Sequence, residues 1–234
     1  MEKKLVLWIS PLVLILLLPL AVPEALKAQG RPLEEIIAQV QKLYDTHEDF
    51  KASFVQESWV KSLGKKQVAE GGVYFKKPGK MRWNYQKPVK QEIVSDGKNL
   101  WNYRPGDKQV VVSPMTQAFQ TKVPSTFLAG IGNLQKDFQA RWGKEPSAGE
   151  AYSLELIPRE DHGGLEKLSL LIDRENFKIL EARMQDLMGN VTQIRFSKIQ
   201  FDNRLSDSLF TFTPPPGVEV FSMPGAFPAG PAKK

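Results

Sequence analysis

The stretch Gly71–Val112, GGVYFKKPGKMRWNYQKPVKQEIVSDGKNLWNYRPGDKQVVV, consists of short alternating runs separated by turn-forming residues. The runs are VYF, MRWNY, QEIVS, NLWNY and QVVV, and the breaks are Lys-Pro-Gly, Lys-Pro, Ser-Asp-Gly and Arg-Pro-Gly. Alternating runs with proline, glycine and Asp-Gly at the breaks are typical of antiparallel strands that follow one another. The stretch therefore predicts a β-meander.

One run in this stretch, GKMRWNYQK, predicts a strand with an apolar and a polar face. Successive side chains of a strand point to opposite sides of the sheet. The apolar face carries Met81, Trp83 and Tyr85, and the polar face carries Arg82, Asn84 and Gln86. A sheet built from such strands has one bulky apolar side to cover.

Upstream of the meander, the hydrophobic period changes from two to 3.6 residues. Pro32 suits the first position of a helix, and Glu34 and Glu35 follow in the first turn, where the helix dipole favours negative charge. The apolar residues at helical spacing are Leu33, Ile36, Ile37, Val40, Leu43 and Tyr44. This pattern predicts an amphipathic helix that either packs on the sheet as core or covers a cavity.

Further strands are predicted on both sides of the meander. Alternating segments separated by turn residues lie at 50–60, 67–75, 152–157, 165–173, 179–186, 191–201 and 210–212, with Gly64-Lys65-Lys66 as the first turn. Short helices are predicted at 114–120 and 125–130. One helix, consecutive antiparallel strands and a short helical insertion make an α+β fold.

The chain begins with the layout of a secretory signal peptide. Two lysines in Met1–Lys4 are followed by a nearly unbroken apolar run, Leu5–Val22, and then by small residues near Ala28. We expect residues 1–28 to be removed, with the cleavage site defined only to within several residues. The alternative is an uncleaved membrane anchor, because about 18 apolar residues can just span a bilayer. Two prolines within the run favour cleavage.

Composition limits the chemistry of the remaining chain. It has no cysteine, which excludes disulfides, thiol nucleophiles and thiolate metal sites. Without residues 1–28 it keeps 29 basic and 24 acidic residues, a mild excess that suits an anionic surface or an acidic partner. Residues 29–221 are expected to form one domain, and 222–234, rich in Pro, Gly and Ala, a flexible tail.

Catalytic motifs are missing from the sequence. The two histidines are His47 and His162, and the Asp161-His162 pair falls in a glycine-rich turn typical of solvated residues. No G-x-S-x-G, H-E-x-x-H or P-loop pattern occurs. We therefore expect no enzyme, no catalytic residue, no cofactor and no metal. The basic aromatic run Lys76–Tyr85 does not predict a nucleic-acid partner, because alternation turns its aromatic rings away from its charges.

Several segments, taken in order, resemble the LolA family, the periplasmic carriers of outer-membrane lipoproteins. They are FKKPGKMRWNYQKP and EIVSDGKNLWNYRP in the meander, KASFVQ at 51–56, PSTFLAGIGNLQKDF at 124–138 and FTFTPPPGVEV at 210–220. The resemblance implies a strongly curved, incomplete antiparallel β-barrel, a half-barrel. Its concave side would be covered by the N-terminal amphipathic helix and the short central helices.

The resemblance also implies a cavity for acyl chains between the helix and the sheet. Its lining would comprise Leu33, Ile36, Ile37 and Val40 from the helix, and Met81, Trp83 and Tyr85 from the sheet. Ordinary core packing is the alternative for each of them. Lys77 stands where the best-known carriers have an arginine that gates closure of the helical lid, and lysine lacks the planar donor fork of arginine. Arg82 is a possible substitute, although alternation directs it outward.

The partners that the resemblance implies are triacylated lipoproteins, an ABC-type release complex in the inner membrane and a lipoprotein acceptor in the outer membrane. The carrier is expected to be a periplasmic monomer that uses no ATP itself. A periplasmic lipid-binding or signal-sensing protein of the same fold is the alternative, because related half-barrels perform those functions.

Overall fold

The computed structural model describes residues 31–115, 132–144, 151–161 and 164–226. The predicted signal peptide and most of the two predicted helices at 114–120 and 125–130 lie outside these residues. No helix in the described part of the chain combines the length and the hydropathy needed to cross a membrane.

The described residues form two α-helices, three 3-10 helices and twelve strands. The helices are α1 (Leu33–Thr46), η2 (Lys61–Leu63), η3 (Pro105–Asp107), α4 (Leu134–Asp137) and η4 (Asp207–Phe210). The strands are β1 (Asp49–Val60), β2 (Lys65–Lys76), β3 (Lys80–Lys87), β4 (Gln91–Asp96), β5 (Asn99–Arg104), β6 (Gln109–Pro114), β7 (Phe138–Trp142), β8 (Ala151–Pro158), β9 (Leu165–Asp173), β10 (Ile179–Asp186), β11 (Val191–Phe201) and β12 (Glu219–Ser222).

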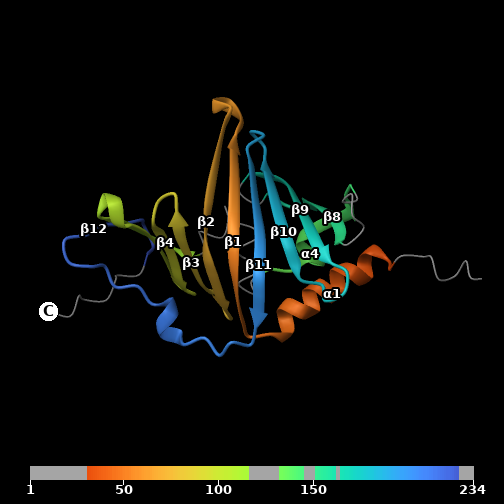
Figure 1. The fold of residues 1–234 in the computed structure, drawn as a ribbon, viewed down its shortest axis with the longest axis horizontal. Coiled ribbons are helices and arrows are strands. Elements are labelled where there is room, and N and C mark those ends of the chain that lie inside the picture. Colours follow the sequence, from red (N-terminus) through yellow and green to blue (C-terminus); the bar gives the residue numbers. More distant parts are fainter. Residues whose placement is uncertain (1–30, 116–131, 145–150, 162–163, 227–234) are drawn as a thin grey trace, which may run out of the picture. The chain divides into compact units, whose positions relative to one another are not determined.

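All twelve strands belong to one sheet, in the order β12-β6-β5-β4-β3-β2-β1-β11-β10-β9-β8-β7 (Figure 1). Two meanders, β1–β6 and β7–β11, meet where β1 pairs with β11. The edge strands β7 and β12 do not pair with each other, so the sheet is open. These features confirm the predicted α+β half-barrel. The parallel pairing of β12 with β6 is an exception to the antiparallel order.

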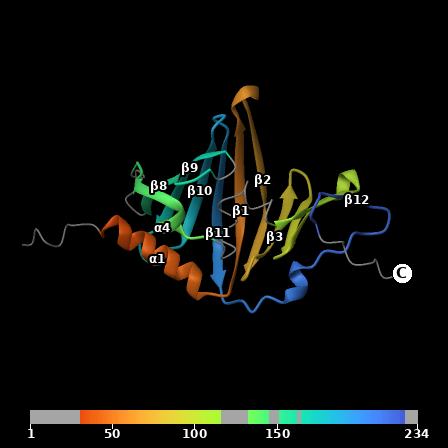
Figure 2. The ribbon, with the colours of Figure 1, turned by 180° about the vertical axis from the view of Figure 1, so that it is seen from behind.

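Helix α1 confirms the 3.6-residue pattern at 33–44. It follows Pro32, has Glu34 and Glu35 in its first turn, and ends where His47 adopts an extended conformation. Its apolar stripe is buried against the sheet through Ile36, Ile37, Val40 and Tyr44. Figure 2 shows α1 and α4 on the same side of the sheet, across the half formed by β7–β11.

The C-terminal region departs from the sequence prediction. Residues 210–212 were predicted as a strand, but Ser206 caps the 3-10 helix η4, and Phe210 at its end is buried. Beyond it, β12 includes Ser222, the first residue of the predicted tail, and the Met223 N–H donates to the Val112 carbonyl oxygen at 2.8 Å. Residues 227–234 are outside the described part.

Two apolar cores lie on opposite faces of the sheet. Ile93 and Leu100 belong to the larger core, and their neighbours Val94 and Trp101 belong to the smaller one, as strand alternation requires. We call the face that α1 covers the inner face, and the face with Val94 and Trp101 the outer face.

Candidate functional site

The predicted cavity residues meet in the larger core, on the inner face. Ile36, Ile37 and Val40 of α1 and Met81 and Trp83 of β3 are buried there. Leu33 and Tyr85 are partly buried and pack against the same core. All seven residues therefore belong to one apolar core on the inner face, four from the helix and three from the strand.

Aromatic rings that the sequence analysis did not single out surround these residues. The Phe54 ring lies edge-on to the rings of Trp83 and Tyr85, with centroids 4.9 and 5.0 Å apart. Phe75 contacts Trp83 edge-on at 5.9 Å and stacks on Phe50 at 4.8 Å. The alternation in FKASF (50–54) and VYF (73–75) would have predicted that Phe50, Phe54 and Phe75 lie on one face of the sheet. These rings make the inner face a broad apolar surface.

Two phenol groups, those of Tyr44 and Tyr85, are among the polar groups on the inner face. The Tyr44 hydroxyl accepts from the Ile179 N–H at 3.1 Å, and burial raises the Tyr44 pKa above its ordinary value. The Tyr85 hydroxyl donates to Gln56 Oε1 at 3.0 Å, and burial raises the Tyr85 pKa to about 12. Because neither phenol ionises near neutral pH, this surface suits an uncharged apolar ligand.

Polar contacts from α1 to other parts of the described structure include those of Tyr44 and Gln41. Besides the Tyr44 hydroxyl, Gln41 Oε1 accepts from the Leu134 N–H at 2.9 Å. Just past the end of the helix, His47 Nδ1 lies 2.7 Å from Asp202 Oδ2. The cover of the inner face thus combines a buried apolar stripe with these polar contacts.

Lys77, one of the two predicted gating residues, lies beside the end of α1. Its N–H donates to the Glu48 carbonyl oxygen at 2.9 Å. Burial lowers the pKa of the Lys77 ammonium, and the carboxylates of Asp45 and Glu48 act in the opposite direction. Lys77 thus experiences the charge of Asp45 on α1.

Arg82, the other predicted gating residue, has its described contacts on the outer face. Its Nε donates to Asn84 Oδ1 at 2.9 Å, and Nη1 donates to the Leu209 carbonyl oxygen at 3.0 Å. Nη2 forms an ion pair with Glu92. These contacts attach η4 to β3 and β4, on the face opposite α1.

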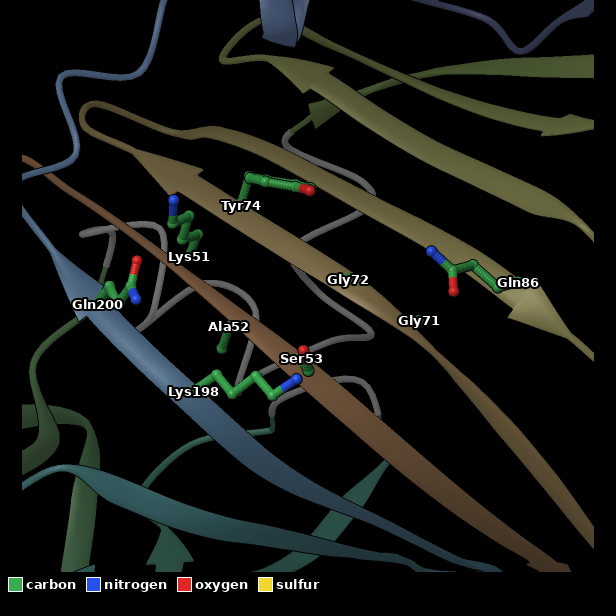
Figure 3. Close-up of a pocket in the computed structure, with 9 residues that line it drawn as sticks. All are labelled: Lys51, Ala52, Ser53, Gly71, Gly72, Tyr74, Gln86, Lys198 and Gln200. Atoms are coloured by element: carbon green, nitrogen blue, oxygen red, sulfur yellow. The ribbon is translucent and has the colours of Figure 1, made fainter.

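A groove of about 390 Å³ opens on the sheet (Figure 3). Lys51 and Ser53 on β1 alternate with Phe50 and Phe54, so their side chains lie on the outer face. The register between β1 and β11 shifts here, and Lys198 has a positive φ of 53°. The groove is lined by Lys51, Ala52, Ser53, Gly71, Gly72, Tyr74, Gln86, Lys198 and Gln200. Its polar lining makes it unsuited to acyl chains.

A family model described as "Outer membrane lipoprotein carrier protein LolA" matches residues 45–213. The chain belongs to the LolA family. An outer-membrane lipoprotein carrier protein from Nitrosomonas europaea is 34% identical over 171 residues, which cover 73% of this chain and 81% of the relative. One from Bordetella avium is 33% identical over 207 residues, covering 87% and 93%.

The fold is shared with a solved structure as well. An uncharacterized conserved protein from Thermus thermophilus has a TM-score of 0.52 and 18% identity, and the match covers 81% of this chain and 98% of that one. This LolA-family chain therefore shares its fold with a protein that has little sequence similarity to it.

Proposed function

We propose that this LolA-family protein is a periplasmic chaperone that binds the acyl chains of lipoproteins released from the inner membrane and carries them to the outer membrane. The observation that carries the proposal is the inner face itself. It joins a broad apolar surface to a helical cover that buries an apolar stripe against the same core. The family relatives named as outer-membrane lipoprotein carriers support the same function.

Exposure of lipoprotein acyl chains to water has a large free-energy cost. Three acyl chains contain on the order of 45 methylenes, and at about 0.8 kcal/mol each their exposure to water would cost up to about 36 kcal/mol. A lipoprotein in an aqueous compartment must therefore hide its chains. The protein would do so with binding energy from apolar burial alone, without a catalytic step.

In the described structure the predicted lining residues are packed in one apolar core, so acyl chains would take the place of contacts that α1 makes with that core. Movement of α1 away from the sheet would open the inner-face core, to which Met81 and Trp83 belong, while the sheet keeps its hydrogen bonds. Met81 suits this role because its flexible thioether side chain adapts to irregular apolar partners. Lys77, near Asp45, is positioned to favour the closed arrangement, whereas Arg82 holds the opposite face.

The proposed partners are a triacylated lipoprotein, an ABC-type release complex in the inner membrane and an acceptor in the outer membrane, and the protein would act as a monomer. Native mass spectrometry tests this after incubation with vesicles that contain the release complex, a triacylated lipoprotein and ATP. A soluble one-to-one complex that forms only with ATP is expected. If the protein instead acquires phospholipid while the lipoprotein stays in the vesicles, it is a lipid-binding protein of the same fold.

A further inference from the structure

Two hairpin turns far apart in sequence lie side by side at one end of the sheet. The turn between β1 and β2 holds η2, and the turn between β10 and β11 spans residues 187–190. The Lys61 N–H donates to Asn190 Oδ1 at 3.0 Å, and the Lys61 side chain lies over Gly189. Figures 1 and 2 both show the two turns at the same end. We call residues 61–66 and 187–190 the hairpin tip.

The hairpin tip extends beyond its neighbours on one side. Strand β2 pairs with β3 from Glu70 to Lys76, so its first part, Lys65–Ala69, has only β1 beside it in the described sheet. The tip is thus a narrow convex projection, not a groove.

Three large apolar side chains stand on this projection. Leu63, Leu187 and Met188 are 66%, 72% and 78% exposed. Exposure of a single apolar residue is common, but three at the joined ends of two hairpins form a distinct feature.

The backbone of the tip holds these side chains outward. Gly64 and Gly189 provide positive φ angles of 58° and 81°. The Asp186 carboxylate accepts from the backbone and side-chain N–H groups of Asn190 at 2.8 Å. The Leu187 N–H donates to the Gly164 carbonyl oxygen at 2.9 Å. The turns are therefore ordered without a partner, and binding would cost little conformational entropy.

Lysines surround the apolar side chains. Lys66 pairs with Glu57 at 2.6 Å. Lys61 and Lys65 have no carboxylate within 4 Å among the residues that the structure describes. The tip thus combines an apolar end with positive charge just behind it.

We infer that the hairpin tip inserts shallowly into the surface of an anionic lipid bilayer. Leu63, Leu187 and Met188 would reach the boundary of the acyl region, while the lysines would remain among the phosphate groups, as basic side chains do at membrane interfaces. A protein partner fits less well, since a stable interface buries about 800 Å² on each side and a narrow convex projection offers little area. This inference does not depend on the inner-face site.

Vesicle flotation tests the inference with the processed form of the protein. Binding to vesicles of phosphatidylcholine with phosphatidylglycerol is expected, with much weaker binding to phosphatidylcholine alone. The triple variant Leu63→Ser, Leu187→Ser, Met188→Ser should lose about tenfold or more in affinity, since burial of apolar groups drives insertion. The double variant Lys61→Gln, Lys65→Gln should lose the preference for anionic vesicles and its sensitivity to salt.

A matched control is Val220→Ser, which removes an exposed aliphatic side chain, 42% exposed, from the edge strand β12. Its vesicle binding should equal that of the unchanged protein. Equal loss in the control and in the triple variant, or unchanged binding in the triple variant, would overturn the inference. Circular dichroism confirms that each variant is folded.

The absence of cysteine allows a second, site-specific test. A polarity-sensitive fluorophore on Met188→Cys should shift to shorter wavelength with anionic vesicles, whereas the same fluorophore on Trp142→Cys, at the other edge strand, should not. No shift at position 188 would contradict insertion.

Discussion

The two faces of the sheet are covered by segments that are attached in different ways. On the inner face, α1 buries an apolar stripe, and its polar links include Gln41 and Tyr44. On the outer face, the segment from 202 to 226 covers the core of Val94, Trp101, Val110 and Val112. Charged groups and backbone hydrogen bonds hold that segment in several places.

Asp49 and Lys76 are two of the side chains that attach the outer cover to the sheet. The Asp49 carboxylate accepts from the N–H groups of Asn203 at 2.6 Å and Leu205 at 2.8 Å. Burial alone would raise the Asp49 pKa, but these hydrogen bonds keep it below its ordinary value. Lys76 Nζ donates to the Leu205 carbonyl oxygen at 2.8 Å and pairs with Asp207 at 2.7 Å.

From this difference we propose which cover of the sheet moves. Apolar contacts are non-directional and can be exchanged for contacts with an acyl chain, whereas buried charge-assisted hydrogen bonds cannot be lost without a large cost. We therefore expect α1 to open and the outer cover to stay in place.

The largest effect is expected from Met81→Glu, which places a carboxylate on the inner face. Acyl-chain binding should be abolished, because an ionised group has no partner among the apolar residues there. The circular-dichroism spectrum should remain that of the folded sheet. Met81→Leu, which keeps the apolar volume, should bind lipoprotein normally. Normal binding by Met81→Glu would remove Met81 from the site.

Asp49→Ala should affect the other cover. It leaves the N–H groups of Asn203 and Leu205 without their acceptor, so the free energy of unfolding should fall by about 2–3 kcal/mol. Chemical denaturation measures this change. Acyl-chain binding to the folded variant should be unchanged, and a loss of binding equal to that of Met81→Glu would show that the two covers are not independent.

Strong acid should loosen the outer cover at η4. Lys76 and Lys80 hold the pKa of Asp207 at about 2. Because this folded-state pKa is below the ordinary value of 3.8, the stabilisation is complete above about pH 4 and disappears as the pH falls towards 2. The Asp207→Asn variant should lack this pH-dependent contribution to the free energy of unfolding. Identical acid unfolding curves for the two proteins would contradict the assignment.

A smaller effect is expected from Tyr44→Phe. It removes the acceptor of the Ile179 N–H, so stability should fall by about 1 kcal/mol. Amide hydrogen exchange in α1 should accelerate more than exchange in β12, because the lost hydrogen bond holds only the inner cover. Equal acceleration in both segments would indicate global, not local, opening.

Much of this arrangement could be predicted from the sequence. Alternation in the meander assigned Met81, Trp83 and Tyr85 to one face, and the helical period assigned Ile36 and its neighbours to the other side of the same core. Phe54 was not among the predicted lining residues, although FKASF has the same alternation as MRWNY. Local sequence patterns are enough to assign residues to a face wherever one side of a helix or strand is buried.

Long-range features could not be predicted in this way. No local pattern shows that β1 pairs with β11, or that β12 (EVFS) pairs in parallel with β6. These pairings depend on contacts across the whole sheet. The 3-10 helix at Asp207–Phe210 is fixed by contacts from Lys76 and Arg82, more than 120 residues away in the chain. Periodicity also predicts burial without showing how firmly a cover is attached, so the contrast between the two covers required the structure.

The central claim is that α1 moves while the outer cover stays. Pulsed electron paramagnetic resonance can test it on the cysteine-free chain with spin labels at Lys42→Cys on α1 and Ser197→Cys on β11, both exposed positions. The control pair is Ser208→Cys with Ser197→Cys. On binding a triacylated lipopeptide, the distance from 42 to 197 should lengthen and the distance from 208 to 197 should stay the same. An unchanged distance to α1 in the loaded protein would contradict the account.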